Sequence, residues 1–472
     1  MPTSRFASTA ISFPAIVAAG GAAAIAFGEK IGINGGQGWD GLAYTEWAIH
    51  GTRVLHEGLT RYHAQRVLPS LIVSPFAHDV HSTLNAFAIW NVIVLTIAAV
   101  LWADLSRRWT RPAAWAGFIA LFGSFAVAKH AIYYPALTDP TAFALGMLMV
   151  WGFLTKRPIA LVIAAIAGAL TWPALPPLAL AMLIVPTGRP IERDIPKLAV
   201  GAGMLAAIVF LAVGLRYLAH PVPDVGDEKF ADWVMRPWLA LTLPLLVAMI
   251  VAGIYYVVAP TGGVIAYVRG LSRRRLAVTV AITSAIYVGL ALYLSQVGTK
   301  GAGPTGAQFL CEHTLAAFRG PLWGPVAHVV YFGPIVVIAM LAWKRIGRVA
   351  WSWGPAMSLA LAMIVMFAAG SNSRQWSHLV PVLVAVTIAA TEARWTWWTV
   401  SGFAALTLAW SKIWLHIGYD SVDNWLRFPN QRYFMQTGPY MATDTFVVHL
   451  IAVVLTLGLV YTGSRWGGSR SS

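Results

Sequence analysis

The chain has 472 residues, of which 58% are hydrophobic and only 11% are charged, and its formal net charge is +15 at pH 7. Soluble proteins carry roughly 25% charged residues, so this chain has too few polar side chains to cover a globule of its size. The composition excludes a soluble enzyme, a disordered chain and a coiled coil. With a mean hydropathy of +0.67, it predicts a polytopic helical membrane protein. The single cysteine, Cys311, excludes an internal disulfide and a cysteine-rich metal site.

Apolar windows close to the length of a membrane-crossing helix recur along the chain. The longer ones lie near 11–27, 84–103, 113–129, 198–218, 237–258, 276–296, 327–343, 351–369, 398–415 and 444–462, and shorter ones lie near 141–155, 159–171, 173–186 and 379–391. We therefore expect an all-α integral membrane protein with about fourteen transmembrane helices, in a range of twelve to fourteen. The first window is long for a cleaved signal peptide, so it predicts an uncleaved helix.

Basic residues alternate along the loops as the positive-inside rule requires. With the amino terminus in the cytoplasm, the inner loops hold a large excess of cations over acids, whereas the outer loops are balanced. Membrane orientation therefore accounts for the net positive charge, and no nucleic-acid partner is expected. In this scheme both termini are cytoplasmic and all 12 histidines lie on the outer side.

The outer loops are longer than most inner ones, which indicates that they carry the function. They span 28–82, 130–140, 219–236, 297–326, 370–378 and 416–443. The first of them is rich in aromatic and aliphatic residues and predicts helices that lie along the membrane surface. We expect two modules, an amino-terminal transmembrane module at 1–218 that includes the outer loop 28–82, and a second transmembrane module at 219–472.

The most informative motif follows the first predicted helix and reads Trp39-Asp40-Gly41, then Tyr44 and Ala48. One interpretation makes Asp40 a helix cap and Trp39 an interfacial anchor. The other makes the Asp40 carboxylate a general base that takes a proton from an acceptor hydroxyl. The two interpretations are compatible, because a capping carboxylate is held in position.

The pattern Trp-Asp-Gly-x-x-Tyr-x-x-x-Ala after a first transmembrane helix resembles the first outer loop of the GT-C glycosyltransferases, in particular the bacterial relatives of the mannosyltransferases that use dolichyl-phosphate-mannose. The resemblance implies an inverting enzyme of the bacterial inner membrane that takes a sugar from a polyprenyl phosphate on the periplasmic side, with Asp40 as base. Tyr44 and Glu46 would then shape the acceptor side. Where those relatives continue into a Phe-Phe-Pro-rich segment, this chain has Arg66 to Ser70, so the resemblance does not extend to the sugar.

A second acid, Asp139, lies in the outer loop 130–140 just before Pro140. On the residues alone it is a helix cap, with proline at the first helical position. By the resemblance, the second outer loop contributes a further catalytic acid, and Asp139 would orient the acceptor or hold a metal. The predicted reaction requires no cofactor, and no metal site is predicted because a carboxylate pair lacks further ligands.

The departing lipid phosphate gains negative charge and therefore calls for cations. Arg374 and His378 precede Pro381 in a segment that resembles the donor-phosphate segment of a late GT-C helix, and the alternative is an interfacial arginine in a Trp belt. Arg66, one turn after Tyr62, and Lys412, four residues before His416, are the other candidates for binding the donor phosphate. For both, anchoring to lipid headgroups is the alternative. In this scheme the module at 219–472 faces the lipid donor.

The expected partners are a polyprenyl-phosphate-sugar donor, a glycan or lipid acceptor of the cell envelope, and membrane lipids. Three other functions remain open: a polysaccharide or lipid-linked oligosaccharide ligase, a secondary transporter or exporter, and a noncatalytic assembly partner. Ion-coupled transporters place acids or bases near the middle of the membrane. The predicted spans hold none deep inside, which favours the transferase.

Overall fold

The computed structural model describes residues 4–57, 59–184, 196–220, 232, 234–258, 273–297, 306–417, 433–434 and 437–466. Every regular element in these ranges is a helix. The predicted all-α class is therefore confirmed. Large parts of the predicted outer loops 219–236 and 416–443 lie outside the described residues, as do residues 298–305 of the loop 297–326 and the end of the chain.

Long apolar helices support the prediction of a membrane protein. Within the described ranges, six stretches are long and apolar enough to cross a bilayer: Val80–Arg108, Lys197–Ala219, Arg236–Val258, Arg273–Leu294, Ser373–Arg394 and Thr443–Gly463. Two bent pairs raise the number to at most eight, namely Arg111–Phe122 with Ala126–Tyr133 and Trp323–Phe332 with Ile335–Trp353. The expected count of about fourteen is not confirmed.

Breaks and short helices account for the difference. Four of the remaining apolar helices, Asp139–Leu154, Pro158–Ala169, Leu175–Ile184 and Pro355–Ala369, have 10–16 residues, and at 1.5 Å per residue such helices cover only about 15–24 Å of the roughly 30 Å of hydrocarbon. The window 327–343 contains a bend of 116°, where Gly333 has a φ of +79° and Pro334 begins the next helix. The window 113–129 contains a bend of 51°, followed by the π-helical turn η5 (Ala126–His130).

The chain forms two compact units, each made of segments that are distant in the sequence. Unit 1 comprises Met1–Ile184, Ser272–Gly303 and Ser411–Met435, and unit 2 comprises Val185–Leu271, Pro304–Trp410 and Gln436–Ser472.

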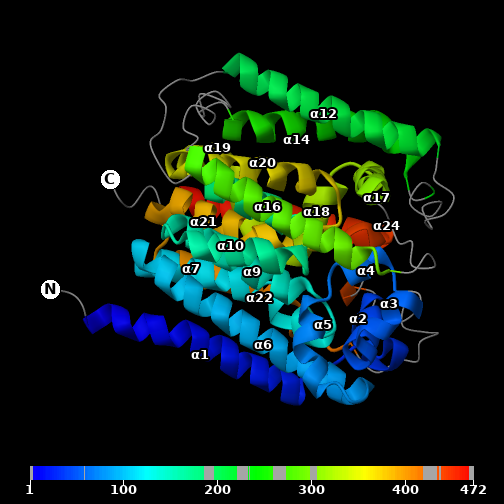
Figure 1. Ribbon diagram of the computed structural model, residues 1–472. Coiled ribbons are helices and arrows are strands. Elements are labelled where there is room, and N and C mark those ends of the chain that lie inside the picture. Colours follow the sequence, from blue (N-terminus) through cyan, green and yellow to red (C-terminus); the bar gives the residue numbers. More distant parts are fainter. Residues whose placement is uncertain are drawn as a thin grey trace. The chain divides into compact units, whose positions relative to one another are not determined.

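Unit 1 is a bundle around α6 (Val80–Leu105), which packs against α1 (Ser4–Phe27) and α9 (Asp139–Leu154) (Figure 1). The remaining longer helices are α7 (Arg111–Phe122), α10 (Pro158–Ala169), α11 (Leu175–Ile184) and α16 (Arg273–Leu294). A Cβ added at Gly21 of α1 would lie 2.6 Å from the Val92 side chain of α6, so a small residue lets these two helices approach closely.

Short helices fill the predicted outer loop 28–82, so its helical character is confirmed. They are η1 (Ile33–Gly36), α2 (Asp40–His50), η2 (Gly51–Arg53), α3 (Val54–Glu57), α4 (Arg61–Ala64), α5 (Leu68–Val73) and η3 (Ser74–Phe76). Both α2 and α5 pack against α6. Their core includes Tyr44, Ala48, Val73 and Phe87, all buried. This packing gives the loop a defined structure on the end of α6.

Unit 2 contains the paired helices α12 (Pro196–Ala219) and α14 (Leu239–Val258), which lie side by side (Figure 1). Its other helices are α17 (Gly306–Phe318), α18 (Trp323–Phe332), α19 (Ile335–Trp353), α20 (Pro355–Ala369), η10 (Ser373–Leu379), α21 (Val380–Thr391), α22 (Trp397–Ser411) and α24 (Thr443–Trp466). The core contains Phe210, Leu246, Ile250 and Phe318. In α14 this core takes up one face of the helix, because Leu246 and Ile250 are four residues apart.

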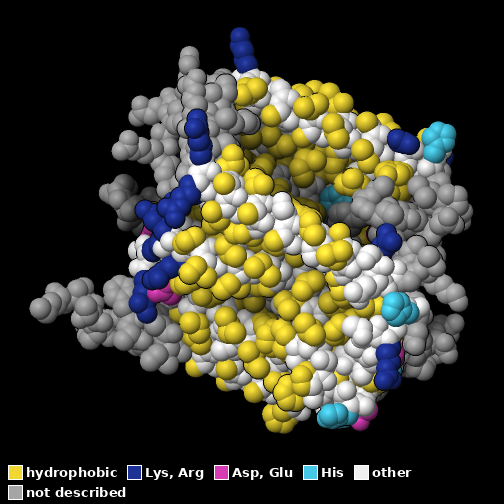
Figure 2. Space-filling model, viewed as in Figure 1, with side chains coloured by type: hydrophobic (Ala, Val, Ile, Leu, Met, Phe, Trp, Pro, Cys, Tyr) yellow, Lys and Arg dark blue, Asp and Glu magenta, His cyan; other side chains and the backbone are white. Residues whose placement is uncertain are grey.

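Large apolar side chains are exposed on several helices. Leu205 of α12, Leu292 of α16 and Leu455 of α24 are each more than 60% exposed. Figure 2 shows that hydrophobic side chains cover much of the face of the molecule that is seen in Figure 1. Soluble monomers rarely expose apolar surface on this scale, so these side chains fit contact with lipid.

Candidate functional site

Asp40 lies at the start of α2, after a turn that only small residues allow. Asn34, Gly35, Gly36 and Gly38 all have positive φ, and the Asn34 side-chain amide donates a 2.7 Å hydrogen bond to the Gly38 carbonyl. Trp39 occupies the N-cap position, and Asp40 is the first helical residue. A carboxylate in the first turn interacts favourably with the helix dipole, so the local sequence positions this acid.

The two predicted acidic loops meet at Gly41 and Tyr134. The Gly41 amide donates to the Tyr134 hydroxyl at 3.0 Å, and a Cβ on Gly41 would lie 2.9 Å from the Tyr134 ring and from Ala136. Glycine is therefore needed here for close packing. The Asn91 amide of α6 donates to the carbonyls of Ala131 and Pro135, which ties this second loop to the bundle.

Asp139 begins α9 and is 7% exposed. Thr138 is the N-cap residue and Pro140 follows at the start of the helix. The beginning of α9 is held on α6, because the Trp90 indole donates to the Thr141 hydroxyl at 3.0 Å. Asp139 therefore sits on the same anchored loop as Tyr134, which contacts the residue after Asp40.

His63 faces Asp40. Its Nε2 lies 3.8 Å from Asp40 Oδ1, and its Nδ1 lies 2.7 Å from the Thr60 hydroxyl. Thr60 also caps α4 by accepting the His63 backbone amide. The His63 ring packs edge-on against Tyr44 with a centroid distance of 5.5 Å. In the tautomer in which Thr60 donates to Nδ1, the Nε2 proton points toward the carboxylate.

Arg66 is a buried cation between two aromatic rings. Its side chain is 3% exposed, and its guanidinium carbon lies 4.0 Å from the Tyr62 ring centroid and 4.1 Å from that of Trp172. Nε is buried without a hydrogen-bond partner. Across the described part of the chain, no carboxylate pairs with Arg66. A buried cation is normally paired with an anion, so the Arg66 guanidinium is a candidate for binding an anionic ligand.

Arg66 and His63 belong to one turn of chain, since the Arg66 amide donates to the His63 carbonyl at 2.9 Å. Tyr62 contacts both side chains, with its ring 5.0 Å from that of His63. The turn thus presents an imidazole to Asp40 and a guanidinium to Trp172. The sequence predicted a role for Arg66 beside Tyr62, but it gave no signal that singled out His63 or Trp172.

The two acceptor-side candidates on α2 differ in their surroundings. Tyr44 is 1% exposed and lies in the core against Phe87 and Ala136. Glu46 is 43% exposed and pairs with His50 one turn later at 3.4 Å. Of these two candidates, Tyr44 is the one that packs against His63, which faces Asp40.

Lys412 follows α22 and is 6% exposed, with a φ of +56°. Its Nζ donates a 2.6 Å hydrogen bond to the Tyr433 carbonyl and lies 5.0 Å from the Phe125 ring centroid. Burial lowers the pKa of Lys412 to about 7. Because α22 ends at Ser411, Lys412 and His416 do not share the helix face that their spacing predicts.

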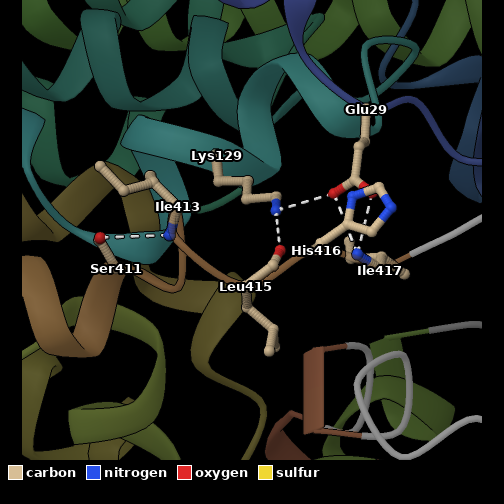
Figure 3. A network of polar contacts seen from close by, with 7 residues as sticks. All are labelled: Glu29, Lys129, Ser411, Ile413, Leu415, His416 and Ile417. Carbon is tan, nitrogen blue, oxygen red and sulfur yellow. Dashed lines mark hydrogen bonds and ion pairs between the residues drawn. The ribbon is translucent and has the colours of Figure 1, made fainter.

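Glu29 holds the segment after Lys412 in place (Figure 3). Its carboxylate lies 2.6 Å from His416 Nδ1 and 3.1 Å from Lys129 Nζ, and it accepts the Ile417 amide at 2.9 Å. Lys129 also donates to the Leu415 carbonyl at 2.6 Å. We call these groups the Glu29 clamp. The Glu29 clamp joins three segments that are distant in the sequence: the residues just after the first helix, the η5 turn and residues 415–417.

Arg374 and His378 belong to unit 2, whereas the six other candidates belong to unit 1. Both lie in η10, where His378 is fully buried. The segment is fixed by His328 of α18, whose Nδ1 lies 2.8 Å from the Ser373 hydroxyl and accepts the Trp376 indole at 3.2 Å. His328 Nε2 in turn lies 3.1 Å from the Ala368 carbonyl. Spacing alone gave no signal for His328.

Within the described ranges, no three His, Cys, Asp or Glu side chains gather closely enough to hold a metal ion. The Asp40 carboxylate has the His63 imidazole beside it, and the turn that carries His63 also carries the Arg66 guanidinium. Such a set suits proton removal beside an anion. In comparisons with known proteins, no protein-family model, no curated protein and no solved structure matches this chain.

Proposed function

We propose that the protein is an inverting glycosyltransferase of the bacterial inner membrane, which moves a sugar from a polyprenyl-phosphate donor to an acceptor hydroxyl on the periplasmic face. The observation that carries the proposal is the turn that presents His63 to the Asp40 carboxylate at 3.8 Å and holds the buried Arg66 between Tyr62 and Trp172.

Asp40 serves as the general base in this mechanism. It removes the proton of the acceptor hydroxyl while the oxygen attacks the anomeric carbon from the face opposite the phosphate. The carboxylate is 29% exposed, so an acceptor can reach it. His63 positions the carboxylate from one side, and Tyr44 supports the imidazole. General-base assistance contributes about 10²- to 10⁴-fold in rate.

Arg66 stabilises the leaving group. As the bond between the anomeric carbon and the phosphate oxygen breaks, its electron pair goes to the phosphate, which changes from a phosphodiester monoanion to a monoester dianion. A buried guanidinium interacts strongly with such charge because little water screens it. The flanking rings hold its plane, and no carboxylate in the described residues competes with the phosphate.

The other candidates keep supporting roles in the proposal. Asp139 and Glu46 shape the acceptor side, with Asp139 on the loop that Tyr134 joins to the start of α2. Lys412 assists Arg66 with the donor phosphate, and the donor-binding roles of Arg374 and His378, which belong to unit 2, stay predictions from the sequence. No cofactor or metal enters any step.

Transfer by Asp40→Asn tests the proposal. The full-length protein is reconstituted in liposomes with a panel of radiolabelled polyprenyl-phosphate sugars, and new glycosidic products are separated from free donor. The variant should lose about 10²- to 10⁴-fold in rate and keep its melting temperature. Asp104→Asn is the matched control, because Asp104 is 45% exposed and pairs with Arg107 away from the site.

Full activity of Asp40→Asn would remove Asp40 from the mechanism. Movement of unmodified sugar across the bilayer, without a new glycosidic bond, would replace the transferase with a transporter.

A further inference from the structure

A cavity lies in unit 2. It has a volume of about 570 Å³ and is lined by Asp232, Val234, Met235, Arg236, Pro237, Trp238, Arg319 and Thr443. This volume falls in the range of small-molecule sites, about 300–1,000 Å³. None of these residues belongs to the site proposed for glycosyl transfer.

Arg319 forms the fixed wall of the cavity. Its guanidinium donates to the carbonyls of Pro439 and Met441 and stacks on the Trp323 ring at 4.4 Å. The Arg319 backbone carbonyl accepts a hydrogen bond from the Met235 amide at 3.2 Å. This bond connects Arg319 to the segment that carries Met235 and Arg236. Burial lowers the pKa of Arg319 to about 10, so the group stays charged at neutral pH.

Arg236 supplies the second cation. It begins the turn η7 (Arg236–Trp238), its side chain is exposed, and within the described residues no hydrogen bond or ion pair engages its guanidinium. Among the described residues, the lining holds two cations and one acid, Asp232. This balance attracts an anion, and guanidinium groups bind phosphate in a bidentate manner.

An apolar track leads away from the cavity. Trp238 lines the cavity and is 49% exposed, and it is followed on α14 by exposed residues at Leu241, Leu245, Ala248, Ala252 and Tyr256. Their spacing of three or four residues places them on one face of the helix. The stretch Arg236–Val258 is also long and apolar enough to span a bilayer. A ligand with a phosphate in the cavity and acyl chains along this face would match both features.

We infer that this cavity binds the phosphate headgroup of an anionic membrane lipid, with Arg236 and Arg319 on the phosphate and the acyl chains along the exposed face of α14. The site is separate from the donor-phosphate role of Arg66. Basic pockets between membrane helices bind anionic headgroups by the same chemistry, and Trp238 suits the boundary between headgroup and chain.

Binding of short-chain lipids to the full-length protein in neutral detergent tests the inference. Dioctanoyl-phosphatidylglycerol, dioctanoyl-phosphatidylcholine and inorganic phosphate are each titrated, with affinity measured by thermophoresis. The phosphatidylglycerol should bind at least about tenfold more tightly than either other probe, because only it offers both an unpaired anionic phosphate and chains.

Two variants locate the site. Arg236→Gln should weaken phosphatidylglycerol binding by about tenfold, whereas Trp238→Ala should weaken lipid binding but not phosphate binding. Arg53→Gln is the matched control, because Arg53 is exposed in unit 1 and its side chain contacts no polar partner among the described residues. It should bind like the unmodified protein.

Equal affinity for both lipids, or an unchanged affinity of Arg236→Gln, would overturn the inference. Phosphate that binds as tightly as phosphatidylglycerol would make the cavity a site for free phosphate instead. Glycosyl transfer by Arg236→Gln is measured in parallel and should be retained, so failure of this inference and failure of the proposed function give different results.

Discussion

The guanidinium of Arg66 stacks on Trp172 at 4.1 Å, although Arg66 lies between α4 and α5 and Trp172 lies between α10 and α11. The turn between α10 and α11 that carries Trp172 is tied to the Arg66 segment by the hydrogen bond from the Leu68 amide to the Leu170 carbonyl at 2.9 Å. This arrangement buries a cation that has no counter-ion among the residues the structure describes. A substitution at Arg66 can therefore distinguish a role in binding the donor phosphate from a role in stabilising the fold.

Replacement of Arg66 by methionine should keep or raise the melting temperature, because apolar groups of similar size often stabilise a protein when they replace buried charges. The same change should raise the KM for the donor roughly 10- to 100-fold, which corresponds to the loss of one charge-assisted hydrogen bond. Thermal unfolding and donor titration of the purified protein measure the two effects. A lower melting temperature with unchanged donor KM would show that Arg66 serves the fold.

Replacement of His63 by glutamine should lower kcat by about tenfold, since an imidazole that only positions the base contributes about as much as one hydrogen bond. The donor KM should stay unchanged, because His63 faces Asp40 and the phosphate is assigned to Arg66. Steady-state kinetics over a range of donor concentrations separate the two constants. A change in KM alone would place His63 on the donor side.

Lys412 should make stability depend on pH. Burial lowers its pKa to about 7 from an ordinary value of 10.5, so between these pH values the unfolded chain binds the proton and the folded protein does not. Unfolding therefore becomes harder as pH rises through this window, and the full cost of the buried lysine is present below pH 7.

Thermal unfolding of the protein and of Lys412→Met between pH 6 and 10 measures this effect. The melting temperature of the unmodified protein should rise relative to that of the variant as pH increases. Parallel curves for the two proteins would contradict the lowered pKa of Lys412.

The Glu29 clamp should protect the backbone of residues 415–417. In Glu29→Gln the carboxylate no longer pairs with Lys129 and His416, and its bond to the Ile417 amide weakens (Figure 3). Hydrogen exchange at Ile417 should accelerate roughly tenfold or more, because a hydrogen bond to a charged group contributes about 1.5–3 kcal/mol. Asp104→Asn, which removes an acid outside the clamp, should leave this exchange rate unchanged.

The local sequence pattern was sufficient to predict where the helix that carries Asp40 begins. The glycine-rich approach and the acid at the head of an apolar stretch predicted a helix beginning near Asp40, and α2 begins at that residue. Apolar windows likewise predicted helices throughout. They did not predict the break at Gly333, because a window records average hydropathy and not the dihedral angles of one glycine.

Composition and periodicity thus determined that the chain is a helical membrane protein, because burial in lipid demands apolar residues over whole helices. The tertiary structure alone decided that His63 faces Asp40, that Trp172 covers Arg66, and that residues 411–417 join unit 1. These pairings depend on how helices pack and where chains turn, and no spacing in the sequence records contacts between segments that are distant along it.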